Sequence, residues 1–232
     1  MEYCLICFNE LKLEVGWTTI FSKENAAPIC AACEAKFTKI SGETCLICDR
    51  PLAIVEPKFK VNNHCLDCVR WEEAEKWSGV LMKNYSVVIY NDFSQEVIAR
   101  YKYRGDYILA YAIAYLMKKK LNGIKFDVMI PIPLSESRQY ERGFNQSEAL
   151  ILASGYESST LLTRTHSEKQ SKKSRSERIH LPEVFQMEGK VSNQNILLID
   201  DIYTTGSTLR HAAKLVKEAG AASVCSLTFA RG

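Results

Sequence analysis

The sequence lacks any long apolar segment. No run of about 18 apolar residues occurs, which is near the length that a membrane-spanning helix needs. Met1 is also not followed by the basic and then apolar region that is typical of a secretion signal. We therefore expect a soluble intracellular protein without a transmembrane segment.

An ATP-type phosphate loop is also missing. The motif G-x-x-x-x-G-K-[ST], whose backbone and lysine hold nucleotide phosphates, occurs nowhere in the chain. A site for phosphate, if there is one, must be built in another way.

The composition is that of a folded protein with an uneven charge. The chain has 232 residues, of which 47% are hydrophobic, so it can form one ordinary domain and a small one. We place the boundary between residues 1–78 and 79–232. The first part has a net charge of −3 and the second of +6. The second part is therefore the better candidate for binding a polyanion such as DNA.

Eight of the nine cysteines form C-x-x-C pairs in the first 70 residues. The pairs are Cys4/Cys7, Cys30/Cys33, Cys45/Cys48 and Cys65/Cys68. In a chain without a secretion signal, metal binding is favoured over disulfides. Two such pairs supply the four thiolates of a tetrahedral zinc site. Such a site has no open position for catalysis, so it would stabilise a region too small for a core of its own.

The pairing of these cysteines has more than one solution. Two sequential sites are our first choice, since the last two pairs have the spacing usual for zinc. An interleaved arrangement, or one filled site and one vestigial site, are the alternatives. His64 is expected to be a bystander, and Cys225 is expected to lie in the core.

The segment from Ile196 to Gly220 has the strongest functional pattern. Four apolar residues predict a buried parallel strand, and the acidic pair Asp200 and Asp201 follows it. A turn and then a helix ending at Gly220 come next. The turn residues are Thr204, Thr205, Gly206, Ser207 and Thr208.

This order of residues predicts an anion site with an acidic rim. Backbone N–H groups at the start of a helix bind phosphate, and Gly206 allows close approach. Ionised Asp200 and Asp201 only accept hydrogen bonds, so they suit a ribose diol or hydrated magnesium. A plain strand–turn–helix connection with a capping aspartate is the simpler alternative.

A second candidate anion loop follows the predicted strand Phe126–Ile130. Arg138 and Arg142 suit pyrophosphate oxygens, and Gly143 and Asn145 can adopt the positive φ of an anion-binding turn. Ligands bind where strands of an α/β sheet end. An ordinary exposed loop is the alternative.

Two further segments are rich in cations. Tyr101–Asp106 alternates aromatic and basic residues, which is typical either of base stacking or of a half-buried helix end. Residues 164–178 carry six cations and almost no apolar side chain. Lys172, Lys173, Arg175 and Arg178 are its candidates for pyrophosphate or a DNA backbone, unless the segment is simply a solvated loop.

The remaining patterns predict the architecture. Strands are expected at 85–90, 159–162, 223–229 and, at an edge, 185–191. Ser94 and Asp106 are expected to cap helices, and Lys118, Lys119 and Lys120 to form a solvated helix end. With the strands above, we expect an α/β sheet of about five mostly parallel strands, preceded by a small cysteine-rich zinc module.

The Asp200–Thr208 segment closely resembles the phosphoribosyl pyrophosphate (PRPP) motif of type I phosphoribosyltransferases. The resemblance implies that the acids hold the ribose hydroxyls and the turn holds the 5′-phosphate. With the PIP…RGFNQ loop and the four cysteine pairs, the whole chain resembles the ComF family. That family implies a role in natural transformation, in which incoming single-stranded DNA is handled at the inner face of the membrane with a helicase-like ATPase.

Three functions fit this sequence. The first is a ComF-type DNA-uptake factor that binds PRPP and magnesium as effector or substrate. The second is an active phosphoribosyltransferase for an unidentified base or amine. The third is a scaffold in which the motif is a relic. Against the second, phosphoribosyltransferases usually recognise their base with a hood region, and none is visible unless the zinc module replaces it.

Overall fold

The computed structural model describes residues 3–11, 27–164 and 185–232. The amino-terminal part contains α2 (Ala31–Ala35), the 3₁₀ turns η1 (Leu52–Ile54) and η2 (Pro57–Phe59), β1 (Lys60–Val61), β2 (His64–Cys65) and α3 (Leu66–Glu73). The remainder contains β3 (Lys83–Ile89), α4 (Asp92–Tyr103), α5 (Leu109–Leu121), β4 (Val128–Pro131), α6 (Glu136–Arg142), α7 (Gln146–Ala153), β5 (Leu162–Arg164), β6 (Phe185–Met187), β7 (Asn195–Tyr203), α8 (Ser207–Glu218) and β8 (Ser223–Arg231).

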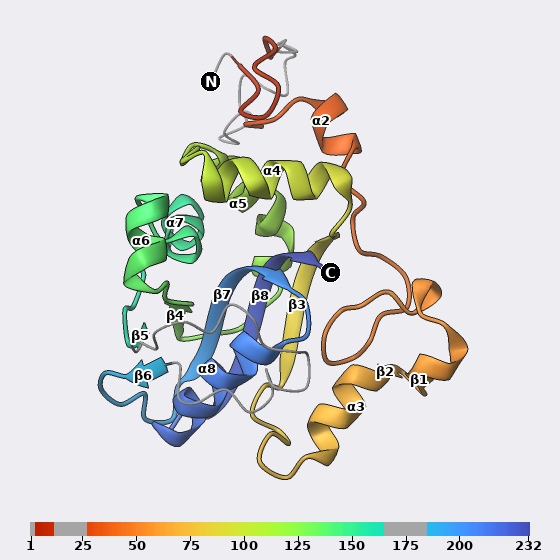
Figure 1. Ribbon diagram of the computed structural model, residues 1–232, viewed down its shortest axis with the longest axis vertical. Coiled ribbons are helices and arrows are strands. Elements are labelled where there is room, and N and C mark those ends of the chain that lie inside the picture. Colours follow the sequence, from red (N-terminus) through yellow and green to blue (C-terminus); the bar gives the residue numbers. More distant parts are fainter. Residues whose placement is uncertain (1–2, 12–26, 165–184) are drawn as a thin grey trace.

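A parallel sheet of four strands organises the molecule (Figure 1). The strand order is β3-β8-β7-β4, and all three pairings are parallel. The expected mostly parallel sheet is therefore confirmed, but within the described ranges it has four strands and not five. The strands predicted at 159–162 and 185–191 are the difference: β5 and β6 pair antiparallel with each other in a separate ribbon, so neither joins the parallel sheet.

Alternate residues of the inner strands pack on opposite faces of the sheet, as the period of two requires. Leu197 and Ile199 of β7 belong to a core shared with α4, α5 and α7. Ile196 and Leu198 belong to the opposite core, under α8. Both faces are covered, which explains why the β7 segment is an almost continuous apolar run.

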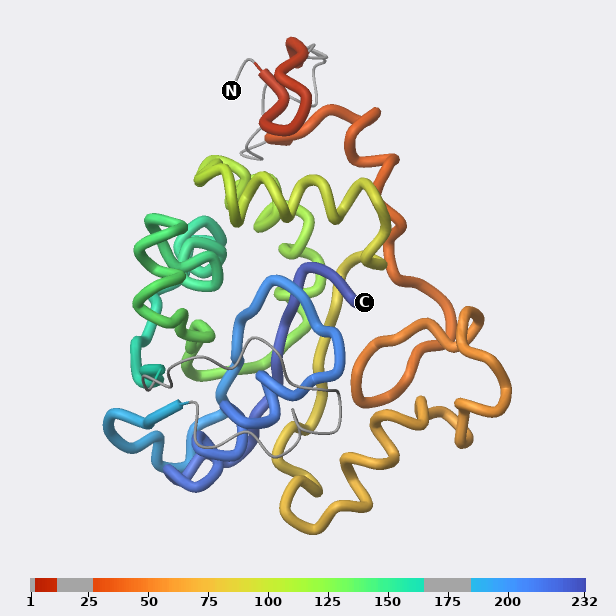
Figure 2. Tube along the Cα trace, viewed as in Figure 1, coloured from red at the N-terminus to blue at the C-terminus, as the bar shows by residue number. Residues whose placement is uncertain are grey.

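The cysteine-rich region divides between these two cores. Cys4 and Cys33 pack with the core under α4 and α5, whereas Cys45, Cys48 and Cys65 pack with the core under α8. The trace between the two clusters runs along the outer edge of the sheet (Figure 2). There the Ile40 N–H donates to Val87 O and the Ile89 N–H donates to Thr38 O, so part of the exposed edge of β3 is paired.

Three helix-end predictions need correction. Asn91, not Ser94, is the N-cap of α4; Ser94 sits three residues later and returns a bond to the Asn91 N–H, which makes a capping box. Asp106 does not cap α5, which begins at Leu109 without a side-chain cap, because its carboxylate is bound to Arg100. Asn145 has a φ of −84°, not a positive one, because it caps α7; Gly143 does adopt positive φ, at 76°.

Lys120 also differs from the prediction of a solvated helix end. Its Nζ lies 2.8 Å from the Asp49 carboxylate, between Cys48 and the sheet. Asp49 is only 1% exposed and also accepts the Ser86 N–H at 3.1 Å, while Lys83 Nζ lies 3.5 Å from its other oxygen. This single carboxylate therefore fastens the second cysteine cluster to β3 and α5.

None of the helices in the described parts of the chain combines the length and apolar character that crossing a membrane requires.

The Asp49 contacts generate a stability prediction. Asp49→Asn should lower the free energy of unfolding by about 2 kcal/mol, because two partly buried lysines lose their counter-charge while water still screens them. For a chain of this size that corresponds to a fall in melting temperature of roughly 4–8 °C by calorimetry. Glu56→Gln is the control, since Glu56 forms an exposed ion pair with Lys58 and its loss should change little. An equal fall in melting temperature for the two substitutions would contradict the role that we give to Asp49.

Candidate functional site

The acidic pair lies near the carboxyl end of the inner strand β7 and faces a lysine. Lys102 Nζ of α4 lies 2.6 Å from Asp201 Oδ2, and both side chains are largely buried. Asp200 Oδ1 accepts the Asp201 N–H at 2.9 Å and the Ser147 hydroxyl at 3.3 Å. Lys102 was predicted only as part of a basic and aromatic segment. Its pairing with Asp201 depends on the packing of α4, which sequence spacing does not reveal.

The environment of Asp200 disfavours the ionised form of its carboxyl. Burial, and then the neighbouring Asp201 carboxylate, raise the pKa of Asp200 to about 7, although Lys102 acts in the opposite direction. Burial disfavours the charged form because it removes water from the carboxylate. A cationic or hydrogen-donating ligand would therefore favour the ionised form of Asp200.

The hydroxyl-rich turn follows directly and begins α8. Gly206 occupies the N-cap position with a φ of 80°, where residues with a side chain are strained. A Cβ at Gly206 would also fall 2.1 Å from Tyr203 Oη. Thr204 and Thr208 are exposed, and Thr205 and Ser207 are partly buried. The turn thus presents hydroxyls beside the start of a helix of 12 residues, where phosphate binds well.

The second predicted anion loop is mostly a short helix. Arg138 is exposed on α6, and Gly143 ends that helix. Arg142 Nη1 donates to Gln146 Oε1 at 2.7 Å, and its guanidinium lies 5.5 Å from the centre of the Tyr103 ring. The expected loop is therefore wrong in form, because Ser135 accepts the Arg138 N–H and so caps a helix there.

Arg164, at the end of β5, was not among the predicted binding residues. Burial and the neighbouring Arg138 lower the pKa of Arg164, and the Asp200 carboxylate offsets part of that effect. The structure thus brings Arg164 and Arg138 to the same end of the sheet as Asp200. The other predicted loop residues, Lys172, Lys173, Arg175 and Arg178, lie outside the described residues.

Tyrosines in the Tyr101–Asp106 segment divide between the two predicted roles. Tyr101 is fully buried and its hydroxyl donates to Gln146 O at 2.7 Å, so it cannot stack on a base. Tyr103 is 72% exposed. Of the two tyrosines in this segment, only Tyr103 is available to a ligand.

The cysteines form two groups of four, as expected for sequential sites. The groups are Cys4, Cys7, Cys30 and Cys33, and Cys45, Cys48, Cys65 and Cys68. Within each, the sulfur atoms lie within 4.8 Å of one another. A Zn–S bond of about 2.3 Å in a tetrahedron separates sulfurs by roughly 3.8 Å, and Cys7–Cys30 and Cys48–Cys65 are 3.7 and 3.6 Å apart. Both donor sets therefore fit zinc. His64 belongs to neither group, and Cys225 is buried in β8.

The two groups differ in their surroundings. All four cysteines of the second group are buried, whereas Cys7 of the first is exposed and Cys30 is partly exposed. The second group is also linked to the hydroxyl-rich turn before α8, which is the candidate phosphate site. Arg231, at the end of β8, donates from Nη2 to Cys48 Sγ at 3.3 Å and from Nη1 to Thr204 O at 2.9 Å. One buried guanidinium thus touches both a thiolate and the turn.

Two more contacts join the cysteine-rich part to the turn and to α8. The Trp71 indole N–H of α3 donates to Thr205 O at 3.0 Å. Arg210 of α8 is fully buried, pairs with Glu72 at 2.8 Å and lies 5.3 Å from the centre of the Trp71 ring. Trp71 of the cysteine-rich part and Arg231 therefore hold the backbone of the turn in place.

Comparison with known proteins agrees with this geometry. Residues 144–232 match the phosphoribosyl transferase domain family. Over 98% of its length the chain is 37% identical to competence protein ComFC of Bacillus subtilis, of which it covers 94%. It is also 33% identical to competence protein ComFC of Streptococcus pneumoniae, covering 98% of this chain and 99% of that protein. The chain belongs to the ComFC family of competence proteins.

Membership of the ComFC family confirms the resemblance noted in the sequence. The domain match and the parallel sheet also confirm the type I phosphoribosyltransferase-like fold behind a cysteine-rich module able to bind metal. A more distant relative, the DNA utilization protein YhgH of Salmonella typhimurium, is 31% identical over 47% of this chain and 52% of that protein.

The raised pKa of Asp200 generates a second stability prediction. An aspartate whose pKa is higher in the folded than in the unfolded state lowers the free energy of unfolding as it ionises. This loss begins when the pH rises above the unfolded-state pKa, and it is complete above the folded-state pKa, which is about 7 for Asp200. Asp200→Asn should therefore raise the melting temperature at pH 8, and the gain should shrink toward pH 6. The asparagine oxygen can still accept both hydrogen bonds of Asp200.

Asp201→Asn is the matched control for this experiment. It should lower the melting temperature, because it leaves the largely buried Lys102 without its ion-pair partner. Thermal unfolding of both variants at the two pH values measures the difference. If both substitutions raised the melting temperature, or both lowered it, our description of the acidic pair would be contradicted.

Proposed function

We propose that this ComFC-family protein binds PRPP with magnesium at the carboxyl end of β7 and uses that site while handling DNA during natural transformation. The observation that carries the proposal is the sequence of groups at that point: two carboxylates, a hydroxyl-rich turn and a helix start within nine residues, Asp200–Thr208. A ribose diol beside a phosphate matches these groups in order.

The proposal assigns the parts of PRPP to different residues. Asp200 and Asp201 would hold the ribose hydroxyls, and the turn would hold the 5′-phosphate; its residues are Thr204, Thr205, Gly206, Ser207 and Thr208. Arg138 and Arg142, with Gly143 ending their helix, would face the pyrophosphate, and Arg164 is a new candidate for the same role. Lys172, Arg175 and Arg178 would complete the enclosure. Magnesium would neutralise charge on the pyrophosphate when bound.

Zinc would have a structural role in this account. We propose that each cysteine group holds one zinc ion with all four positions filled by sulfur, so that neither ion contacts the substrate. Residues 1–78 would then be a metal module and residues 79–232 the ligand-binding domain. Thiolate ligands of this kind persist in the reducing cytoplasm, where we place the protein.

PRPP binding is tested by calorimetry with the zinc-replete chain and magnesium. The wild type should bind, and an Asp200→Asn, Asp201→Asn double variant of unchanged zinc content should not, because each asparagine lacks the negative charge and one of the two acceptor oxygens that the diol needs. Affinity should also fall as the pH drops below about 7, since protonated Asp200 is a poorer acceptor. An absence of binding by the folded wild type would leave a scaffold with a relic motif.

Phosphoribosyl transfer is the second candidate function. The gathering of Arg138, Arg142 and Arg164 at one end of the sheet favours it, because cations there would stabilise departing pyrophosphate. In that reaction the bond from the anomeric carbon to pyrophosphate oxygen breaks as a bond to the acceptor nitrogen forms. Pyrophosphate release that requires an acceptor would separate an enzyme from a PRPP-responsive binder.

Contact with single-stranded DNA is the third element of the proposal. The net charge of +6 over residues 79–232 supports it, and Lys172, Arg175 and Arg178 are our candidates for the DNA backbone, as the alternative to their role in enclosing PRPP. Replacing these three by glutamine should weaken oligonucleotide binding and flatten its dependence on salt. Unchanged binding in a filter or anisotropy assay would remove this segment from the DNA-binding surface. The helicase-like ATPase partner stays a prediction from the family.

A further inference from the structure

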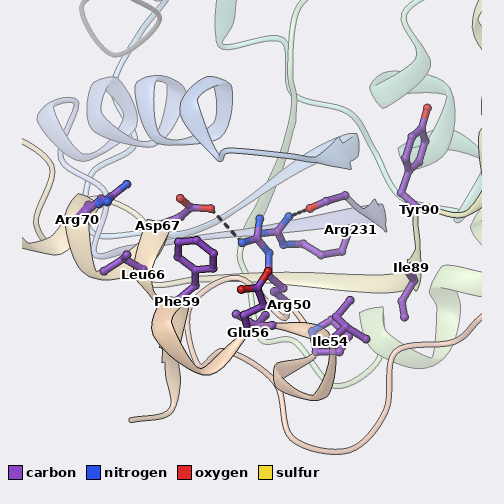
Figure 3. A pocket seen from close by; sticks show the side chains of 13 residues that line it. Arg50, Ile54, Glu56, Phe59, Leu66, Asp67, Arg70, Ile89, Tyr90 and Arg231 are labelled. Atoms are coloured by element: carbon purple, nitrogen blue, oxygen red, sulfur yellow. Dashed lines mark hydrogen bonds and ion pairs between the residues drawn. The ribbon is translucent and has the colours of Figure 1, made fainter. Parts of the chain in front are cut away.

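A cavity lies between the chain around the second cysteine group and the carboxyl ends of β3 and β8 (Figure 3). Its volume is about 530 Å³, which is in the range of sites for small organic molecules. The cysteine-rich part contributes residues of η1, η2 and α3, and the sheet contributes the ends of the two strands. None of the described residues that line the cavity belongs to Asp200–Thr208, so its occupant would be separate from the candidate PRPP site.

The polar lining of the cavity is complementary to an anion. It contains three arginines and two acids, namely Arg50, Arg70, Arg231, Glu56 and Asp67. Asp67 Oδ2 lies 3.0 Å from Arg50 Nη1, as the dashed line in Figure 3 shows. Glu56 pairs with Lys58 at 2.7 Å, so both acids already have a cation as partner. Arg70 is exposed and makes no hydrogen bond or ion pair with the residues that the structure describes. Guanidinium groups bind phosphate well.

An apolar wall stands beside these cations. Ile54 is 65% exposed and Phe59 is 44% exposed, so both have surface that a ligand can cover. In Figure 3 Arg70 and Tyr90 lie at opposite ends of the cavity, and Arg50 and Phe59 lie between them. The lining therefore fits a ligand that joins an aromatic ring to an anionic group.

The cavity is joined to the hydroxyl-rich turn through the end of β8. Arg231 lines the cavity, and its Nη1 donates to Thr204 O at 2.9 Å and to Tyr203 O at 3.1 Å. Gly232 also lines it and donates its N–H to Tyr203 O at 2.9 Å. An occupant that packs against Arg231 and Gly232 would restrict the groups that hold the backbone of the turn. The turn would then lose less entropy when it binds a phosphate.

We propose that this cavity binds a nucleotide, and that the bound nucleotide strengthens the PRPP site through Arg231. The phosphate lies at Arg50 and Arg70, and the base lies against Phe59 and Ile54. A nucleotide joins a stacking ring to a phosphate, which is the combination that the lining offers. A free mononucleotide and the terminal nucleotide of a single strand share this chemistry. The coupling to PRPP, but not the site itself, rests on the proposed function.

The site is tested by calorimetry on the zinc-replete chain without PRPP. AMP and dTMP are the probes, beside adenosine and inorganic phosphate, which each supply one half of the ligand and should bind more weakly. A mononucleotide could also occupy the hydroxyl-rich turn, so the titration is repeated with the Asp200→Asn, Asp201→Asn variant, in which binding should persist. A dT pentanucleotide with a 5′-phosphate forms a second arm. Binding of the free nucleotides or of the pentanucleotide alone supports the site and identifies the source of its ligand.

Two substitutions locate the ligand in the cavity. Phe59→Ala should weaken AMP about tenfold, as expected for the loss of one stacking partner. Arg70→Gln should weaken AMP about two- to fivefold, as expected for an exposed charge, and should spare adenosine. Phe8→Ala and Lys119→Gln are the matched controls, since Phe8 (61% exposed) and the exposed Lys119 lie outside the cavity. All four variants should keep the zinc content and melting temperature of the wild type.

The coupling is measured as the affinity for PRPP and magnesium at one saturating concentration of AMP. It should be about fivefold higher in the wild type than in Phe59→Ala, because competition at the turn is common to both. Equal PRPP affinities would overturn the coupling. Failure of AMP, dTMP and the pentanucleotide to bind, or binding that Phe59→Ala and Arg70→Gln weaken no more than their controls do, would overturn the site. Loss of binding in the Asp200→Asn, Asp201→Asn variant would assign the nucleotide to the turn and also overturn it. Cavity binding without any PRPP binding would keep the site and reject the proposed function.

Discussion

The buried guanidinium of Arg231 is the contact on which the rest of the arrangement depends. It is 3% exposed at the end of β8, and its donors meet Cys48 on one side and the carbonyls of Tyr203 and Thr204 on the other. A buried cation needs such partners, because an unpaired one is costly. In the proposed zinc-bound state four thiolates carry a net charge of −2, so the metal group would supply the counter-charge while the turn supplies the acceptors. Metal module and turn are therefore one electrostatic unit.

The acidic pair at the same end of the sheet is unfavourable without a ligand. Asp200 and Asp201 stand side by side at the end of β7, where burial and mutual repulsion oppose ionisation. Lys102 compensates only Asp201 directly. Such strain is retained at sites where a ligand completes the charge balance. The rigid turn and covered sheet hold the acids in place while the ligand is absent.

Most of the fold was predictable because the periodic signals are strong. The apolar run before Asp200 and the helical spacing after it predicted β7 and α8, and the C-x-x-C spacing predicted both cysteine groups. The errors lie where tertiary contacts override local pattern. Lys120 looked like part of a solvated run but meets Asp49, and Asp106 looked like a cap but meets Arg100. The spacing of residues along the chain predicts neither the Lys120–Asp49 pair nor the Asp106–Arg100 pair.

The candidate site was predictable only in part for the same reason. The acids and turn are contiguous, so sequence reasoning reached them. Lys102 and Arg164 come from other elements, and only the packing of α4 and β5 brings them to the acids. The contact from Arg231 to Cys48 spans 183 positions and has no local signal at all.

The most direct test is the affinity for magnesium and PRPP of an Arg231→Gln variant whose zinc content equals that of the wild type. Arg100→Gln is the matched comparison, since Arg100 contacts Ile6 O in the first cysteine module but not the turn. We predict a loss of affinity of tenfold or more for Arg231→Gln, about 1.4 kcal/mol, and little change for Arg100→Gln. Wild-type affinity in the zinc-replete Arg231→Gln variant would contradict the coupling between the metal module and the phosphate site.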